Sequence, residues 1–306
     1  MTGPVTQHCI VIGGGPAGLT AAIYLARFHL SVTVLDDGRS RARLIPMTRN
    51  HAGFPEGIAG AELVSRMRQQ AEVYGAVIRP WRAESITRVE GGFEVMTVDG
   101  VIGARKVLLA TGVINLRPRM NEAAHAQALA AGLLRYCPVC DGFEVTDRRV
   151  ALLGTGEHAL REAEFMRSFT RDVTLVAPDG AHDFSAAQKE SLARWGIAAV
   201  DGPVTEFQLA QKRITLQAGE RLESFDTLYA ALGTAVRSEL ARGAGADTSA
   251  DGGVLVDRHQ MTSVEGLYAA GDVVKGLDQI SNAMGQAGVA ATAMRNAICE
   301  EAPLRR

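Results

Sequence analysis

Two glycine-rich turns flank a pair of closely spaced cysteines in this chain, and this order limits the fold more than any other feature. The turns are GxGxxG at residues 13–18 and GxGxxA at residues 154–159, with CPVCDG at residues 137–142 between them. A CxxC sequence alone fits half of a zinc site or a redox-active dithiol. Between two dinucleotide-binding turns, we interpret it as two thiols positioned to exchange electrons with a bound cofactor.

The first turn lies within a pattern typical of a βαβ unit. Residues 8–12 are β-rich, residues 19–29 have helical spacing, and residues 31–35 form a second strand followed by Asp36. In such a unit the helix N-terminus faces a pyrophosphate, and the terminal acid accepts hydrogen bonds from a ribose diol. The pattern therefore predicts a dinucleotide site.

Each glycine of this turn has a mechanical reason to be there. Gly13 permits the tight turn, Gly15 lets the backbone approach the pyrophosphate, and Gly18 allows the helix to pack closely on the strand. A GxGxxG motif alone is weak evidence for a dinucleotide site. Here the evidence is stronger because the predicted strand, the predicted helix and the terminal acid surround the motif.

The same architecture occurs a second time. A strand at 149–153 leads into the second turn, a helix continues to about Phe169, and a strand follows at 172–176. Because 306 residues exceed what one core usually organises, two α/β domains are expected. The remaining segments are predicted as a hairpin strand at 92–100, buried strands at 107–112, 227–234 and 266–272, a linker at 243–253 and a helix at 281–297.

The composition of the chain limits which partners and which cellular compartment are expected. The net charge of −2 gives no reason to expect nucleic acid or anionic lipid, and there is no run of 18 apolar residues to span a membrane. Residues 1–7 lack the features of a secretory signal, so a reducing, cytoplasmic location is expected. The other cysteines, Cys9 and Cys299, are isolated and do not complete a zinc site, so no metal is predicted.

Taken together, these residues resemble the low-molecular-weight thioredoxin reductase family, and the resemblance runs essentially from end to end. No single motif is specific, but their combination and order are. The matching segments are Gly13-Gly14-Gly15-Pro16-Ala17-Gly18, Asn50-His51-Ala52-Gly53, Ala110-Thr111-Gly112, Cys137-Pro138-Val139-Cys140-Asp141-Gly142 and Ala270-Gly271-Asp272.

The resemblance implies two Rossmann-like, three-layer ββα domains, the second inserted into the first. Residues 1–116 and 246–306 would form a discontinuous FAD-binding domain, and residues 117–245 a second nucleotide-binding domain carrying the CxxC. It also implies a homodimeric enzyme that passes electrons from FAD to the dithiol, and then to a thioredoxin-like protein or a small disulfide.

Residue by residue, the resemblance puts Asp272 on the FAD ribitol, Gln279 and Ile280 near the flavin pyrimidine, and Asn50 at a polar flavin contact. Taken alone, Asp272 fits a turn cap and Asn50 a surface loop equally well. The FAD site thus expected comprises Gly13, Gly15, Pro16, Ala17, Gly18, Asp36, Asn50, Thr111, Gly112, Gly271, Asp272, Gln279 and Ile280. The second nucleotide site comprises Gly154, Gly156 and Ala159.

The same comparison assigns roles in the dithiol. Cys140 would face the flavin, Cys137 would attack the substrate disulfide, and Asp141 would act as acid and base. Exposed loops around Arg135 and Phe143 are expected to select the substrate.

The chain departs from the family at the NADPH site. Where the family has an HRRxxxR run, residues 177–183 read APDGAHD, so the arginines that pair a 2′-phosphate are missing. Asp278 also replaces an arginine beside the flavin. In lacking this signature the chain resembles the diflavin-linked disulfide oxidoreductases, so the retained turn is expected to hold a second FAD. NADH at this turn and ferredoxin are the alternative electron donors. An ordinary NAD(P)H-dependent thioredoxin reductase and a non-catalytic redox-sensing flavoprotein remain open as alternatives.

Overall fold

The computed structural model describes residues 7–304 and divides the chain into two compact units. The expectation about a secretory signal at residues 1–7, and the outer limits of the expected first domain, fall largely outside the described residues. The first unit contains the chain up to Met47, His51–Ile114, and the chain from Ala235 onward, and the second unit contains Thr48–Asn50 and Asn115–Thr234.

The first unit is built on a seven-stranded sheet with the order β3-β2-β1-β6-β5-β4, in which β17 also pairs with β6. Strands β2, β1, β6 and β17 run parallel, whereas β4 and β5 join antiparallel. The elements are β1 (Gln7–Ile12), α1 (Pro16–Arg27), β2 (Val32–Leu35), η1 (Arg41–Leu44), α2 (Gly60–Val73), β3 (Val77–Arg79), β4 (Ala83–Val89), β5 (Gly92–Thr97), β6 (Gly100–Leu109), α7 (Glu239–Gly243), β17 (Leu267–Ala269) and α8 (Ile280–Glu301).

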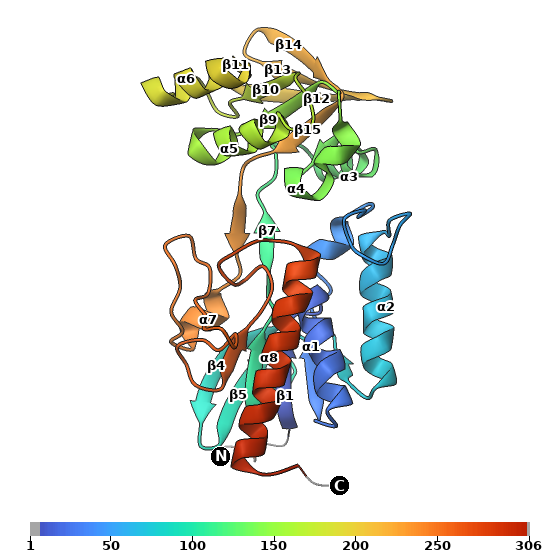
Figure 1. Ribbon diagram of the computed structural model, residues 1–306, viewed down its shortest axis with the longest axis vertical. Coiled ribbons are helices and arrows are strands. Elements are labelled where there is room, and N and C mark those ends of the chain that lie inside the picture. Colours follow the sequence, from blue (N-terminus) through green and yellow to red (C-terminus); the bar gives the residue numbers. More distant parts are fainter. Residues whose placement is uncertain (1–6, 305–306) are drawn as a thin grey trace. The chain divides into compact units, whose positions relative to one another are not determined.

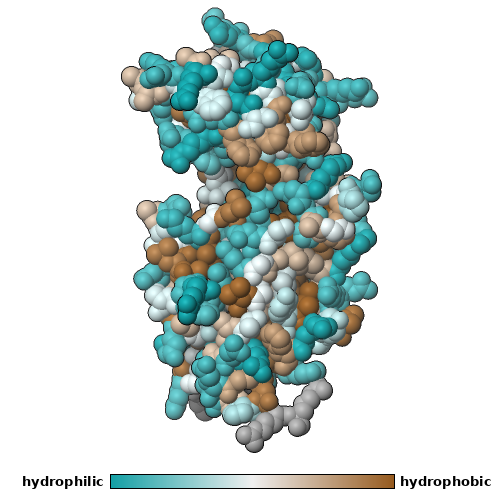
Figure 2. All heavy atoms as spheres, viewed as in Figure 1, coloured by the Kyte–Doolittle hydropathy of each residue, from teal (hydrophilic) through white to brown (hydrophobic). Residues whose placement is uncertain are grey.

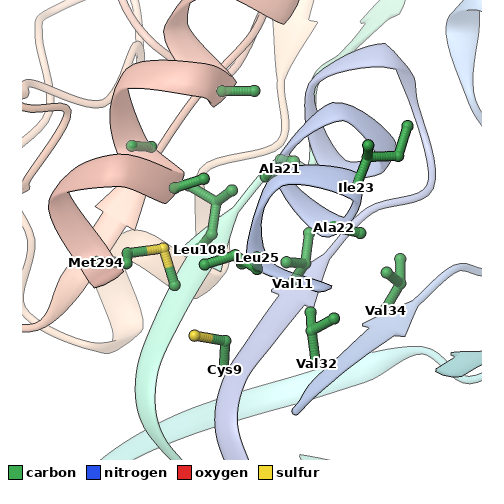
Figure 3. Packing of buried hydrophobic residues seen from close by; sticks show 14 of the residues in the cluster. Cys9, Val11, Ala21, Ala22, Ile23, Leu25, Val32, Val34, Leu108 and Met294 are labelled. Atoms are coloured by element: carbon green, nitrogen blue, oxygen red, sulfur yellow. The ribbon is translucent and has the colours of Figure 1, made fainter. Parts of the chain in front are cut away.

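Helices α1 and α8 lie side by side on this sheet (Figure 1). Their facing sides carry small buried residues, among them Ala21 and Ala22 of α1 and Ala287, Ala290 and Ala291 of α8. Small side chains let the two helices approach closely and cover the strands beneath. Figure 3 shows this cluster around Leu108 and Met294. The cluster holds α1 in place against the sheet, and with it the glycine turn that precedes the helix.

The second unit repeats this plan on a five-stranded parallel sheet with the order β11-β10-β9-β15-β8. A separate three-stranded antiparallel sheet, β12-β13-β14, belongs to the same unit and was not expected from the sequence. The elements are α3 (Glu122–Ala130), β8 (Leu134–Arg135), α4 (Pro138–Asp141), η2 (Gly142–Val145), β9 (Val150–Leu153), α5 (Gly156–Met166), β10 (Val173–Val176), α6 (Ala186–Trp195), β11 (Ala198–Val200), β12 (Val204–Ala210), β13 (Arg213–Ala218), β14 (Arg221–Phe225) and β15 (Thr227–Ala230).

The chain passes between the units along β7 (Val113–Asn115) and β16 (Thr234–Val236), which pair with each other. The chain re-enters the first unit at Ala235, earlier than the boundary expected at residue 245, and α7 already packs in the first unit. Ala241 of this helix is fully enclosed in a core cluster of that unit, beside Ala246 and Val254. The parallel sheets with helices confirm the predicted α/β class.

The face shown in Figure 2 carries hydrophilic residues over most of its area, with apolar residues in small groups. Within residues 7–304, none of the helices is both long enough and apolar enough to span a bilayer.

Candidate active site

In the first unit, the parallel strands bring the predicted FAD residues to one edge of the sheet. β1, β2, β6 and β17 end at Ile12, Leu35, Leu109 and Ala269. Since parallel strands share their carboxyl edge, the turns that follow them meet there, and this edge is where open α/β sheets bind ligands.

The turn after β1 is shaped by its neighbours. Gly13 has φ +116°, and a Cβ there would lie 2.1 Å from the Ala110 carbonyl oxygen. A Cβ at Gly18 would lie 1.8 Å from the Gly13 carbonyl oxygen. Both glycines are therefore required by the fold itself.

Gly15 is different, because the described atoms that a Cβ there would approach belong only to the side chain of Ser40, which can shift, and not to a neighbouring backbone. Its backbone is extended, at φ −84° and ψ −175°. Among the described residues, only Ser40 lies within 4 Å of a Cβ built there, with its Oγ at 3.2 Å. Glycine at this position thus keeps open a space beside the N-terminus of α1 that the protein does not fill.

This opening fits a dinucleotide pyrophosphate. Within residues 7–304, no side chain caps the N-terminus of α1, so its first amides and the positive end of the helix dipole face the opening. Asp36 is 8% exposed and lies against the turn, with its Cγ 2.2 Å from a Cβ built on Gly14. Its Oδ1 accepts a hydrogen bond from the Gly38 amide at 3.0 Å. The residues therefore fit FAD: the uncapped amides of α1 would bind its phosphates, and Asp36 would accept hydrogen bonds from its ribose.

Asp272 belongs to a three-residue ionic cluster that the sequence did not reveal. Arg41 Nη1 lies 3.2 Å from Asp272 Oδ2 and 3.0 Å from Asp278 Oδ2. Burial raises the pKa of both carboxyl groups, that of Asp278 to about 6, while Arg41 acts in the opposite direction. Arg41 thus links two acidic residues that lie more than 200 positions away from it in the sequence.

The remaining expected FAD residues have the following surroundings. A Cβ on Gly271 would lie 2.9 Å from the Ala17 Cβ, so the Gly-Asp turn abuts the start of α1, where Pro16 is the first helical residue. Gln279 is the N-cap of α8, and Ile280 packs beside Leu19 in a core cluster.

Thr111, Gly112 and Asn50 have local bonding partners. The Thr111 hydroxyl donates to the Arg237 carbonyl at 2.6 Å, and the Gly112 carbonyl accepts from the Arg237 amide at 3.0 Å. Asn50 Oδ1 accepts from the Thr48 hydroxyl at 3.0 Å, and residues 48–50 group with the second unit. In the structure, Thr111 and Gly112 therefore hold the returning chain, and their contact with FAD stays a prediction.

In the second unit, Cys137 and Cys140 form a disulfide with sulfurs 2.06 Å apart. Cys137 is the N-cap of α4, and its Sγ accepts a hydrogen bond from the Cys140 amide at 3.1 Å. An amide donor favours the thiolate over the thiol once the disulfide is reduced. Phe143 and Val139, beside the two cysteines, are 80% and 48% exposed.

The Asp141 carboxylate, next to Cys140, is bonded through both oxygens. Arg135 Nη1 donates to Oδ2 at 2.6 Å, and the Tyr229 hydroxyl donates to Oδ1 at 2.8 Å. Burial raises the pKa of Asp141, and Arg135 and Tyr229 counteract that rise. Arg135 itself does not lie on an exposed loop as expected, because it ends strand β8 and its partly buried side chain is engaged by Asp141. Selection of the substrate by the loops around Arg135 and Phe143 stays a prediction. The role of Tyr229 was not expected from the sequence. The one feature that could have indicated it is a hydroxyl group in a strand whose other residues are suited to complete burial.

The second glycine turn keeps its geometry. A Cβ on Gly154 would lie 2.4 Å from the Ala231 carbonyl oxygen and 2.8 Å from the Ala159 Cβ, and Gly156 has φ +71°. Among the described residues, no side chain caps α5, but Glu157 lies in its first turn. Arg161 Nε and Gln188 Nε2 donate to that carboxylate at 3.0 and 3.3 Å.

The loop after β10 carries no arginine. Asp179 pairs with Arg119 at 3.0 Å, and burial lowers the pKa of His182, which favours its neutral form. The loop is also tied down, because the Gly202 amide donates to the Gly180 carbonyl at 2.7 Å. A carboxylate and a neutral imidazole do not suit a 2′-phosphate, which cations bind best.

The two other cysteines are separate from this site. Cys9 is enclosed in the core of the first unit (Figure 3), and burial raises its pKa to about 12, so its thiol is inert. Cys299 lies in α8 and is partly buried. Within residues 7–304, no three His, Cys, Asp or Glu side chains are grouped to hold a metal ion.

Known proteins of one family match this chain over most of its length. The pyridine nucleotide-disulphide oxidoreductase family matches residues 7–287. A thioredoxin reductase of Streptomyces coelicolor is 33% identical over 288 residues, covering 88% of this chain and 86% of that protein. The crystal structure of HlmI matches with a TM-score of 0.88 at 26% identity, covering 98% and 95% of the two chains. The atypical thioredoxin reductase TRi of Desulfovibrio vulgaris Hildenborough is 31% identical, with 98% and 100% coverage and a TM-score of 0.56.

Proposed function

Because this chain belongs to the pyridine nucleotide-disulphide oxidoreductases, and among them to the thioredoxin reductase-like flavin enzymes, we propose that it reduces the disulfide of a thioredoxin-like protein. The observation that carries the proposal is the Cys137–Cys140 disulfide next to the partly buried, hydrogen-bonded Asp141 carboxylate, on the unit with the second glycine turn. FAD bound at the first glycine turn, once reduced by the electron donor, would supply the two electrons that reduce this disulfide.

The reduced dithiol then acts in two exchange steps. The Cys137 thiolate, stabilised by the Cys140 amide, attacks one sulfur of the substrate disulfide. A mixed disulfide forms, the substrate S–S bond breaks, and the departing thiolate takes a proton. Cys140 next attacks the Cys137 sulfur, which restores the internal disulfide and releases the second substrate thiolate. Asp141 accepts the Cys140 proton and passes it to the second substrate thiolate. The first substrate thiolate takes its proton from solvent, because Cys137 reacts as the thiolate, and the substrate is released as a dithiol.

A protein substrate is favoured over a small disulfide by the apolar surface around the dithiol. Phe143 is 80% exposed and Val139 48% exposed, whereas large apolar side chains in a monomeric domain are mostly buried. An exposed aromatic residue beside the reactive pair suits a partner whose own redox site lies in an apolar surface.

The second glycine turn is proposed to hold a dinucleotide that lacks a 2′-phosphate, either NADH or a second FAD. Supporting this are the retained glycine geometry of the turn and the Asp179 carboxylate after β10. The 177–183 loop contains no arginine, and the neighbouring Arg119 is already paired with Asp179, so NADPH should be no better a donor than NADH.

The test combines the flavin-to-protein ratio of purified protein with anaerobic flavin bleaching by NADH, NADPH and reduced ferredoxin. Steady reduction of thioredoxin with one of these donors supports the enzyme, whereas dithiol–disulfide cycling without turnover supports a redox sensor. One flavin per chain with rapid, NADPH-selective bleaching would contradict the proposed second site and favour an ordinary thioredoxin reductase.

A further inference from the structure

The carboxylate beside the dithiol is held by two side chains from different strands. Arg135 is the last residue of β8 and Tyr229 lies in β15, the neighbouring parallel strand of the central sheet. Their donor atoms lie 2.6 and 2.8 Å from the two Asp141 oxygens. One carboxylate therefore receives a cation on one oxygen and a hydroxyl on the other, and its direction is fixed.

Tyr229 has no packing reason to carry a hydroxyl. Its side chain is fully buried in a core cluster of the second unit, among aliphatic residues such as Leu152 and Leu175. Phenylalanine would fill the same space without a polar atom to satisfy. The hydroxyl is used on Asp141, with the carboxyl oxygen at 2.8 Å and the main-chain carbonyl at 3.2 Å.

Arg135 is committed to the same carboxylate. Its Nη1 makes the 2.6 Å contact, while its buried Nε has no hydrogen-bond partner among residues 7–304. A buried guanidinium nitrogen left without a partner costs stability, so packing alone would favour an apolar residue at this position.

We propose that Arg135 and Tyr229 are positioning residues that keep the Asp141 carboxylate oriented and ionised for proton exchange with the Cys137–Cys140 dithiol. The inference rests on the proposed function, in which Asp141 accepts a thiol proton. A carboxylate offers about four lone-pair directions, so two hydrogen bonds leave it able to accept another proton.

The sign of the effect follows from the charges. Burial alone raises the pKa of Asp141, whereas the Arg135 charge and both hydrogen bonds lower it. The Glu144 carboxylate also raises it. Removing either partner should therefore shift ionisation of Asp141, and the acid limb of the exchange reaction, to higher pH.

The experiment measures single-turnover reduction of an aromatic disulfide by the pre-reduced holoprotein from pH 5.5 to 9, under anaerobic conditions. Tyr229→Phe and Arg135→Met should move the acid limb upward by about one pH unit, which is about a tenfold loss of rate below the limb. Their rates at pH 9 should stay within about twofold of wild type. Arg135→Lys, which keeps the charge, should shift the limb less than Arg135→Met.

Arg149→Met is the matched control, because Arg149 is a partly buried arginine of the same unit that pairs with Glu223 at 3.0 Å. It should keep the wild-type pH profile. Rates that fall equally at every pH would assign Arg135 and Tyr229 a structural role, and unchanged profiles would assign them none; either result overturns the inference. Wild-type protein that reduces no disulfide at any pH would instead overturn the proposed function, and the inference with it.

Discussion

Adding one methyl group at Gly15 should remove FAD without unfolding the protein. The backbone at Gly15 is one that alanine adopts, and the nearest described atom to the new Cβ is Ser40 Oγ at 3.2 Å. The fold of Gly15→Ala should therefore persist. The methyl group would instead occupy the space that we assign to the pyrophosphate, at the uncapped end of α1.

The size of the effect follows from the hydrogen bonds that the displaced pyrophosphate could no longer accept. A pyrophosphate at a helix end receives two or three charge-assisted hydrogen bonds, each contributing about 1.5–3 kcal/mol. Loss of two of them amounts to about 3–6 kcal/mol, so the dissociation constant of FAD should rise about a hundredfold or more. Gly15→Val should lower affinity further.

The assay compares flavin content after purification, FAD affinity by calorimetry, and thermal unfolding of the flavin-free proteins. Gly285→Ala is the control, because no described atom lies within 4 Å of a Cβ at this position in α8. It should keep FAD and unfold at or slightly above the wild-type temperature. Gly18→Ala should fail to fold, since its Cβ would meet the Gly13 carbonyl oxygen at 1.8 Å. A Gly15→Ala protein with full FAD affinity would refute the site.

Two further predictions concern the second unit. Burial raises the pKa of Glu162 to about 7. The contribution of the Glu162 side chain to the stability of the fold is therefore full below about pH 4.5 and is lost as the pH rises through 7. At pH 8 the Glu162→Gln variant should be more stable than wild type by up to about 3 kcal/mol, whereas at pH 5 it should not. Melting temperatures at the two pH values test this, and equal differences would contradict it. Phe143→Ala should lower kcat/KM for a protein disulfide about tenfold and leave reduction of a small disulfide unchanged, because we propose that this 80% exposed ring packs against a protein substrate. Equal losses on both substrates would argue against docking.

The local patterns of the chain could be predicted from its sequence. Both βαβ units occur near the expected residues, because glycine spacing and apolar strands are local signals. The strand predicted at 266–272 and the helix at 281–297 correspond to β17 and α8. The predicted family is confirmed by the matching family and relatives.

What the sequence did not reveal depends on contacts between distant residues. Arg135 and Tyr229 are 94 positions apart and meet on Asp141 only because β8 and β15 are neighbours in the sheet. Arg41 reaches Asp272 and Asp278 across more than 200 positions. The residue pattern of a single segment does not indicate such pairs. The boundary at which the chain re-enters the first unit was expected at residue 245, after its observed position, because the short helix α7 lies in a stretch rich in Gly and Ala.

The Cys140 substitution separates the steps of electron flow. With Cys140→Ser, the Cys137 thiol can still attack a substrate disulfide, but no internal thiol resolves the mixed disulfide. The variant should therefore trap thioredoxin covalently, which is detected as a higher-mass species on non-reducing gels. Cys137→Ser is its control and should trap markedly less.

We propose that FAD and the Cys137–Cys140 disulfide exchange electrons. Anaerobic titration with dithionite, followed by the flavin absorbance, counts the electrons that each protein accepts. Because a disulfide is a two-electron couple, wild type should accept two electrons per chain more than the double variant Cys137→Ser/Cys140→Ser, whether one or two flavins are bound. Equal uptake by the two proteins would show that the disulfide does not communicate with the flavin, and would contradict the account.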